Sequence, residues 1–170
     1  NIVDLVITKL PHSTDLVFNL HRRIYNSCLA YYFRWEYSKK SHLLSERFKS
    51  LVEDGKTIDP SDYKFALKQQ DVLARELDEF MANNNFDFLI TASSACVAPM
   101  VEEEENCLDL NLYWTLTRTP VLNAPIFYSN EGLPFGLSLI GRRYSDFRVL
   151  SQAEQFVEAE LFPKESKILD

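Results

Sequence analysis

The first third of the chain carries the spacing of amphipathic helices. Ser13 or Thr14 can accept free backbone N–H groups at a helix start, and apolar side chains then recur every three or four residues. The apolar face that this spacing predicts consists of Val17, Leu20, Ile24, Cys28 and Tyr31. The pattern can continue through Trp35 and weakens at Lys39–Ser41. We therefore expect one long helix here, with a break around Lys39–Ser41.

Two further helices are predicted before residue 86. The first has Leu44, Phe48, Leu51 and Val52 as its apolar face. We expect it to stop at Gly55, because glycine accepts the positive φ of a C-cap without a steric clash. The second starts within Thr57–Asp62, where Asp59 can cap and Pro60 fits the first helical position. It ends at Asn83–Asn85, and its apolar face is Tyr63, Ala66, Leu67, Leu73, Leu77, Phe80 and Met81.

Short apolar runs predict the strands. They are Ile2–Ile7, Phe86–Thr91, Val121–Tyr128 and Phe135–Gly141. The turn cluster Ser129–Gly132 joins the last two as a β-hairpin. Because proline donates no backbone hydrogen bond, Pro120 and Pro125 make the first hairpin strand an edge or irregular strand.

A last helix completes a mixed α/β pattern. Ser145 or Asp146 can cap it, and Pro163 follows its end. Its apolar face is Phe147, Leu150, Ala153, Val157 and Leu161. The elements predict an α/β fold with a mixed β-sheet flanked by helices. Residues 1–170 then form a single domain or a segment of a larger one, and the start at Asn1, without Met, favours a segment.

Composition narrows the classes of function. The 170 residues are 46% hydrophobic with a net charge of −7, which fits a globular domain and argues against a nucleic-acid backbone binder. No run reaches the roughly 18 apolar residues of a membrane span. The odd set Cys28, Cys96 and Cys107 lacks metal-like spacing, so we expect reduced thiols in a cytoplasmic protein. Glu102–Glu105 is interpreted as a solvated loop, and no metal site is expected.

Three sequence motifs follow one another in the second half of the chain. They are FDFLITASSACVAP (Phe86–Pro99), WTLTRTPVLNAP (Trp114–Pro125) and GLPFGLSLIGRRYSDFRVLSQAEQF (Gly132–Phe156). Together they resemble the C-terminal part of the amidase signature family, and the resemblance extends over nearly the whole chain. Two positions depart from the family pattern. Arg118–Thr119 stands where the family usually has Gly before Pro120, and Ala92 stands where it usually has Pro.

The resemblance implies acyl transfer by a nucleophilic Ser with a second Ser and a Lys, and backbone N–H groups of a Gly-rich loop that hold the oxyanion. No stretch of this sequence matches those motifs, so no catalytic residue is assigned. Ser93–Ser94 is interpreted as a pair of loop serines, because an oxyanion loop needs the glycines that ASSAC lacks.

The resemblance also implies a role in lining a substrate pocket. The candidate substrate-binding residues are Thr91, Ser93, Ser94, Trp114, Thr115 and Arg118. Arg118 could pair bidentately with a substrate carboxylate. For each of these residues a structural role stays open: loop hydrogen bonding for the hydroxyls, core packing for Trp114, and plain surface exposure for Arg118. No metal or organic cofactor is implied.

Three functional hypotheses follow. The first is a C-terminal segment of an amidase that hydrolyses a carboxamide, completing the core and the pocket while an N-terminal half or partner subunit supplies the triad. The second is a stand-alone, non-catalytic amidase-like subunit that binds a protein partner. Its docking surface would be the aromatic stripe, defined as Tyr25, Tyr31, Tyr32, Phe33 and Trp35. The third is an unrelated α/β binding module, which a missing strand at Phe86–Thr91 would favour.

Overall fold

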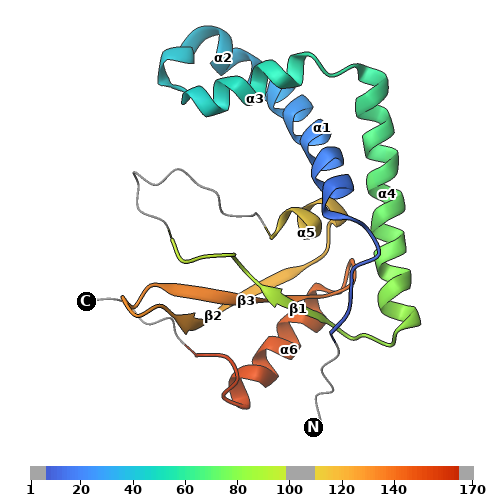
Figure 1. Cartoon of the computed structure of the whole chain (residues 1–170), viewed down its shortest axis with the longest axis vertical. Helices are drawn as coiled ribbons and strands as arrows, with labels where there is room; N and C mark the ends of the chain where they lie inside the picture. Colours follow the sequence, from blue (N-terminus) through green and yellow to red (C-terminus); the bar gives the residue numbers. More distant parts are fainter. Residues whose placement is uncertain (1–6, 99–109, 165–170) are drawn as a thin grey trace. The chain divides into compact units, whose positions relative to one another are not determined.

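The computed structural model describes residues 7–98 and 110–164 (Figure 1). The chain divides into two compact units, Asn1–Leu77 and Asp78–Asp170. The first unit is helical and the second contains the β-sheet. The predicted combination of helices and a small sheet is confirmed. All strand pairs of that sheet among the described residues are antiparallel.

The first unit consists of helices, of which the first and the last begin at the predicted caps. They are α1 (Thr14–Tyr32), α2 (Arg34–Lys40), the 3-10 turn η1 (Ser41–Leu43), α3 (Glu46–Lys56) and the larger part of α4 (Pro60–Asn83). The Ser13 hydroxyl accepts from the Leu16 N–H at 3.3 Å, and Asp59 accepts from the Ser61 N–H at 2.7 Å. The early helices therefore start where side-chain acceptors satisfy the free N–H groups.

Gly55 has a different role from the one predicted. The helix α3 runs through it to Lys56, and Thr57 is the C-cap, so the prediction of a glycine cap is wrong. Gly55 is buried where α3 crosses α1, and an added Cβ would overlap the Asn26 carbonyl oxygen. The glycine is needed because the two helix backbones touch there.

The buried face of α1 is shifted from the predicted one. Its buried residues are Val17, Leu20, Asn26 and Leu29. Tyr31, predicted on this face, is 61% exposed. The helical run breaks first at Phe33, between α1 and α2, and the second break near residue 40 agrees with the prediction. The predicted strand Ile2–Ile7 lies outside the described residues except for Ile7, which is not in a strand.

The sheet of the second unit has the strand order β1-β3-β2 (Figure 1). Its strands are β1 (Leu89–Ala92), β2 (Val121–Tyr128) and β3 (Pro134–Ile140). The predicted hairpin is confirmed, with β2 at one edge and its register shifted between Ala124 and Phe127, around Pro125. The strand predicted at Phe86–Thr91 forms but is shorter and begins at Leu89. This strand and the hairpin remove the observations that would have favoured an unrelated module.

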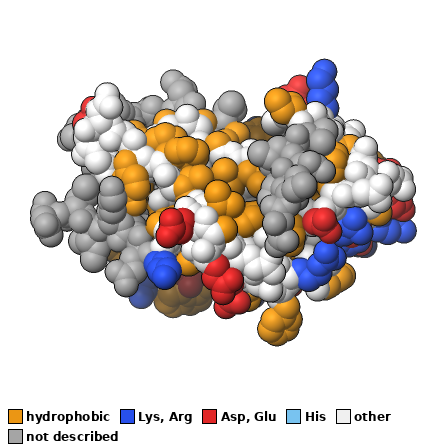
Figure 2. All heavy atoms as spheres, turned by 90° about the horizontal axis from the view of Figure 1, so that it is seen from below, with side chains coloured by type: hydrophobic (Ala, Val, Ile, Leu, Met, Phe, Trp, Pro, Cys, Tyr) orange, Lys and Arg blue, Asp and Glu red, His pale blue; other side chains and the backbone are white. Residues whose placement is uncertain are grey.

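The helix α6 (Asp146–Glu158) lies along one face of this sheet (Figure 1), and side chains between the helix and the sheet form the hydrophobic core. The buried cluster is Ala124, Leu139, Val149, Ala153 and Phe162. The face predicted for α6 is partly wrong, because Phe147 is 88% and Leu150 is 53% exposed while Val149 is buried. Figure 2 shows hydrophobic side chains gathered on the face of the molecule that it displays.

The glycines of the GLPFGLSLIG motif are explained by this packing. Gly132 has φ 85° in the hairpin turn, a conformation that favours glycine. An added Cβ on Gly136 would lie 2.7 Å from Ser93 Oγ, and one on Gly141 would lie 2.6 Å from Ser145 Oγ. The motif therefore brings β3 against β1 and against the start of α6.

Two details of the second unit were not predicted. The helix α5 (Leu112–Thr117) occupies a stretch in which the sequence pattern predicts no helix or strand. Cys96 is disulfide-bonded, so the expectation of reduced thiols is wrong for this residue, whereas Cys28 is free. Cysteine spacing alone does not reveal which thiols the fold brings together.

Candidate functional site

The candidate site is built around the six-residue helix α5. Thr117 is fully buried, and its hydroxyl donates to the Tyr113 carbonyl at 2.9 Å. Arg118 ends the helix in the left-handed conformation, with φ 57° and ψ 40°. Its N–H donates to the Thr115 carbonyl at 3.3 Å, and the Thr119 N–H donates to the Trp114 carbonyl at 3.2 Å. These bonds satisfy the last carbonyls of α5 and turn the chain into β2.

Arg118 lies in the turn before Pro120, where Arg118–Thr119 stands in place of the glycine that the family resemblance implies. The left-handed region is the one that glycine enters at no steric cost, whereas a Cβ makes it unfavourable. The φ of 57° at Arg118 lies in this region, so the turn is one that favours glycine. Arg118 is exposed in this turn.

A surface depression of about 370 Å³ brings three of the predicted site residues together. Its described lining residues are Asn111, Trp114, Thr115, Arg118, Thr119, Val121 and Asn123. Trp114 is only 5% exposed, while Thr115 and Arg118 are exposed. The indole Nε1 of Trp114 is buried and has no hydrogen-bond partner among the described residues. Buried donors are rarely left unpaired, so this atom is one of a few exceptions among the described residues.

The other three predicted residues lie apart from this depression. Thr91 pairs with Ser138 in the β1–β3 ladder. The Ser93 N–H donates to the Gly136 carbonyl at 2.9 Å, and the Ser94 hydroxyl donates to the Cys96 carbonyl at 2.6 Å. Both serines therefore make the local loop hydrogen bonds that a structural role implies. None of the three is among the lining residues of the depression.

One hydrogen bond connects the serine loop to the candidate site. The Asn111 side-chain N–H donates to the Ser93 carbonyl at 3.2 Å. Asn111 precedes α5 and also lines the depression. The loop after β1 therefore supports the start of α5 through its backbone, although its hydroxyls do not reach the depression. Sequence reasoning missed Asn111, and only its place just before an unpredicted helix could have singled it out.

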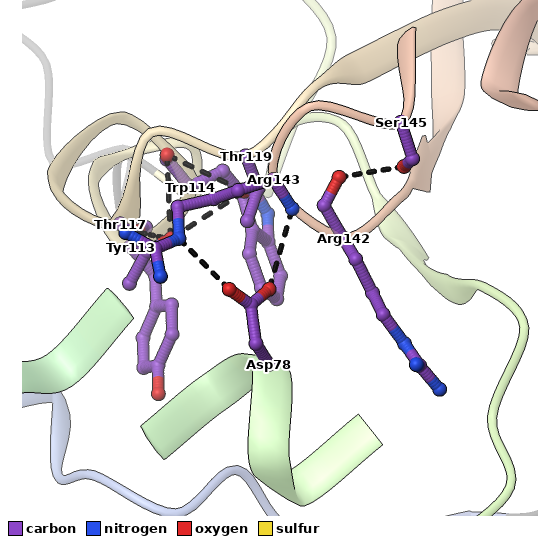
Figure 3. A network of polar contacts seen from close by, with 8 residues as sticks. All are labelled: Asp78, Tyr113, Trp114, Thr117, Thr119, Arg142, Arg143 and Ser145. Atoms are coloured by element: carbon purple, nitrogen blue, oxygen red, sulfur yellow. Dashed lines mark hydrogen bonds and ion pairs between the residues drawn. The ribbon is translucent and has the colours of Figure 1, made fainter. Parts of the chain in front are cut away.

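A polar network fixes the elements around α5 (Figure 3). The carboxylate of Asp78 accepts from the Arg143 side-chain Nε at 2.8 Å and from its backbone N–H at 3.3 Å. The Ser145 hydroxyl donates to the Arg142 carbonyl at 2.6 Å, at the start of α6. The Thr117 and Thr119 hydroxyls lie 3.4 Å apart in the turn that leaves α5. The network holds the loop between β3 and α6 to the end of α4.

A second depression, of about 560 Å³, lies between the end of β2 and the end of α6. Its described lining residues are Pro125, Ile126, Tyr128, Val157, Glu160, Leu161, Phe162, Pro163 and Lys164. None of the predicted site residues is among them. The described residues contain no group of three or more His, Cys, Asp or Glu side chains that could hold a metal ion. Nor does any described helix have the length and apolarity needed to cross a membrane.

Two curated proteins match this chain over a short stretch. The mitochondrial glutamyl-tRNA(Gln) amidotransferase subunits A of Rattus norvegicus and of Mus musculus are each 43% identical over 44 residues. That stretch is 26% of this chain and 8% of each relative.

Solved structures share the fold over most of this chain. A crystal structure of an amidase covers 85% of it with a TM-score of 0.72 and 20% identity. A protein from a vestigial complex linked to the origins of an s-triazine catabolic enzyme covers 94% with a TM-score of 0.77 and 14% identity. Fatty acid amide hydrolase covers 87% with a TM-score of 0.68 and 22% identity. The chain spans 32–36% of the length of these three structures.

A match to a family model identifies the family of this chain. The model described as Amidase matches residues 3–150, which include the helices of the first unit, α5 and the β-hairpin. The resemblance of the motifs is thereby confirmed, and the chain belongs to the amidase family.

Proposed function

We propose that this chain is part of an enzyme that hydrolyses a carboxamide, and that the α5 depression contributes to the wall of its substrate pocket. The nucleophilic Ser, the second Ser and the Lys would come from outside these 170 residues. The observation that carries the proposal is the gathering of Trp114, Thr115 and Arg118 around one depression in a chain of the amidase family.

The composition of the depression supports a binding role. Small-molecule sites are concave, largely apolar, and carry a few placed polar groups. Here the partly exposed Val121 adds apolar surface beside the buried indole of Trp114, while Thr115 and Arg118 are exposed polar side chains. Thr119 keeps the wall in place through its bonds to the Trp114 carbonyl. The depression can therefore bind and orient an acyl group but has no nucleophile–base pair among the described residues that line it.

Thr91, Ser93 and Ser94 take a supporting role in this proposal. Thr91 belongs to the β1–β3 ladder, the Ser93 N–H donates to the Gly136 carbonyl, and the Ser93 carbonyl accepts from Asn111. The Ser94 hydroxyl donates to the Cys96 carbonyl. In α/β proteins, ligand crevices favour the ends of strands, and this loop follows the end of β1. We infer that these residues position α5 and that Ser93 and Ser94 do not act as the nucleophile.

A non-catalytic, partner-binding subunit is the second candidate. The observation that favours it is the aromatic stripe, whose members are all exposed, from 40% for Phe33 to 71% for Tyr32. Contiguous apolar surface of this kind marks an interface with another part of a protein. Either an N-terminal amidase half or a separate partner subunit could cover this aromatic stripe.

The test is amide hydrolysis by the protein purified at its natural length from its own source, with the intact mass measured beside it. The amidase proposal expects ammonia release from carboxamides, and either a mass well above 19.8 kDa or a second chain. Replacing Trp114 by Phe should change KM among amides of different acyl size. Replacing Phe147, which is 88% exposed on α6, by Leu is the matched aromatic control and should change nothing. A mass of 19.8 kDa with no second chain and no hydrolysis would overturn the proposal.

A further inference from the structure

The end of α1 and its connection to α3 carry exposed apolar side chains that the core of the first unit does not use (Figure 1). We call residues 31–43 the α2 connection. Its helix α2 and its turn η1 contain no buried residue. Large apolar side chains are exposed along it, among them Tyr31 at 61%, Tyr32 at 71%, Trp35 at 55% and Leu43 at 71%. Apolar side chains gathered in this way mark a surface that contacts something else.

One side of α2 is already held within the first unit. The Phe33 ring lies edge-on to the Phe48 ring of α3, with the two centroids 5.1 Å apart. Lys56 Nζ, also of α3, lies 4.0 Å from the centroid of the Tyr37 ring. Residues two positions apart on a helix do not face the same side. Trp35, two positions before Tyr37, therefore lies on a side of α2 that α3 does not hold.

The charge of the α2 connection is opposite in sign to that of the chain. Its charged residues are three cations and one anion: Arg34, Lys39, Lys40 and Glu36. Its net charge is therefore +2, whereas the whole chain carries −7. The guanidinium carbon of Arg34 lies 4.6 Å from the Tyr31 ring centroid, and Lys40 Nζ lies 5.3 Å from that of Trp35. Two of the exposed rings thus have a cation beside them.

From these observations we propose that the α2 connection binds the surface of a lipid bilayer with anionic headgroups. Trp and Tyr are enriched where a bilayer meets water, and Lys and Arg beside them reach the headgroups while their stems stay apolar. Lysine is depleted in protein–protein interfaces, which favours a lipid surface over a protein partner here. The rings of Tyr31 and Trp35 would lie at headgroup level, with the three cations against the phosphates. This inference goes beyond the proposed amide hydrolysis and does not depend on it.

The test is flotation of the protein at its natural length with lipid vesicles. Vesicles of phosphatidylcholine and phosphatidylserine in equal parts should bind it. Vesicles of phosphatidylcholine alone should bind at least about tenfold more weakly, since each cation near an anionic surface contributes about fivefold. Raising the ionic strength from about 0.1 M to about 1 M should weaken binding to the mixed vesicles, because the Debye length falls from about 10 Å to about 3 Å.

Single substitutions locate the binding surface. Trp35→Ala should weaken binding to the mixed vesicles about tenfold through the lost apolar area, and Lys39→Gln about fivefold through the lost charge. Both side chains are exposed, so both variants should fold, which circular dichroism checks. The matched controls are Phe147→Ala, at an exposed aromatic residue of α6, and Lys68→Gln, at an exposed lysine of α4. Both controls should bind like the unaltered protein.

Two results would overturn the inference. If Trp35→Ala and Lys39→Gln bind the mixed vesicles as well as the unaltered protein does, another surface meets the lipid. If the unaltered protein does not bind these vesicles, including the case in which a second protein chain copurifies with it, the α2 connection is not a lipid-binding surface. Amide hydrolysis without vesicle binding would leave the proposed function standing alone, and vesicle binding lost in Trp35→Ala without hydrolysis would leave only this inference.

Discussion

The backbone of Asn26 in α1 occupies the space that a side chain on Gly55 in α3 would need. A Cβ on Gly55 would overlap the Asn26 carbonyl oxygen, lie 2.5 Å from its carbonyl carbon and reach within 2.9 Å of Ala30 Cβ. The obstacle is backbone, which cannot turn aside as a flexible side chain does. The first unit is therefore built on a helix crossing that admits only glycine at this position.

Replacing Gly55 by Ala should destabilise the first unit. Alanine is the better helix former by about 1 kcal/mol, so propensity alone would stabilise α3. Overpacking a close contact costs about 1–3 kcal/mol, and here it forces two helices apart. We expect a net loss of about 1–2 kcal/mol in the free energy of unfolding, measured by urea denaturation followed by circular dichroism. Ser50→Ala, at an exposed position of the same helix, is the control and should be neutral or slightly stabilising. A Gly55→Ala protein as stable as Ser50→Ala would contradict this account.

The bond between Asp78 and Arg143 should stabilise the fold far more than the exposed pair Asp87–Arg148 of the second unit. Asp78 accepts two bonds from Arg143, and the two side chains are only 27% and 15% exposed. Removing one partner of a partly buried, hydrogen-bonded pair leaves the other unsatisfied, at a cost of about 1–3 kcal/mol. Asp78→Ala should lower the free energy of unfolding by that amount in urea denaturation.

Asp87→Ala is the matched control for this measurement. Asp87 lies 3.2 Å from Arg148, and these side chains are 77% and 62% exposed. Exposed pairs contribute about 0–1 kcal/mol because water and salt screen them. Equal effects of the two substitutions would show that the network in Figure 3 does not hold the β3–α6 loop in place.

The helices could be predicted because their signals are local. Ser13 and Asp59 lie next to the N–H groups that they cap, and the apolar spacing of α4 needs no distant partner to be recognised. The function of Gly55 could not be predicted in the same way, since its contact, Asn26, is 29 positions away in the chain (55 − 26). The helix α5 was missed because a six-residue helix is shorter than two turns and offers no full period to recognise.

The candidate site was predicted in part for a related reason. The motif order placed Trp114, Thr115 and Arg118 in one segment, and adjacent residues around a single turn stay together in any fold. Ser93 and Ser94 were grouped with them by residue type. Their hydrogen bonds depend on Gly136 and Cys96, which only the folded chain identifies. The unpaired Trp114 Nε1 is likewise a property of packing that no sequence pattern contains.

The cap of α4 predicts a pH dependence. Hydrogen bonds from the Ser61 hydroxyl and the Ser61 N–H lower the pKa of the Asp59 carboxyl below its usual range. A carboxyl whose pKa is lower in the folded state stabilises the fold fully above its unfolded pKa, about 3.9, and loses that contribution as the pH falls through the folded value. Asp59→Ala should therefore lower the thermal midpoint at about pH 6, and the difference from the unaltered protein should shrink below about pH 4. A difference that stays constant down to about pH 2 would show that the charge of Asp59 is not what caps α4.

The turn after α5 predicts a stabilising substitution. A side chain in the left-handed region costs about 1–2 kcal/mol relative to the right-handed one, and Arg118 has φ 57°. Arg118→Gly removes this cost but gives the unfolded chain more freedom, which offsets about 0.4–1 kcal/mol. We expect a net gain of up to about 1 kcal/mol in the free energy of unfolding. Arg118→Ala loses the same guanidinium and keeps the Cβ, so it isolates the backbone contribution and should show no gain. If the two variants are equally stable, the conformation of Arg118 is not strained, and the turn then gives no reason for the usual glycine of the family.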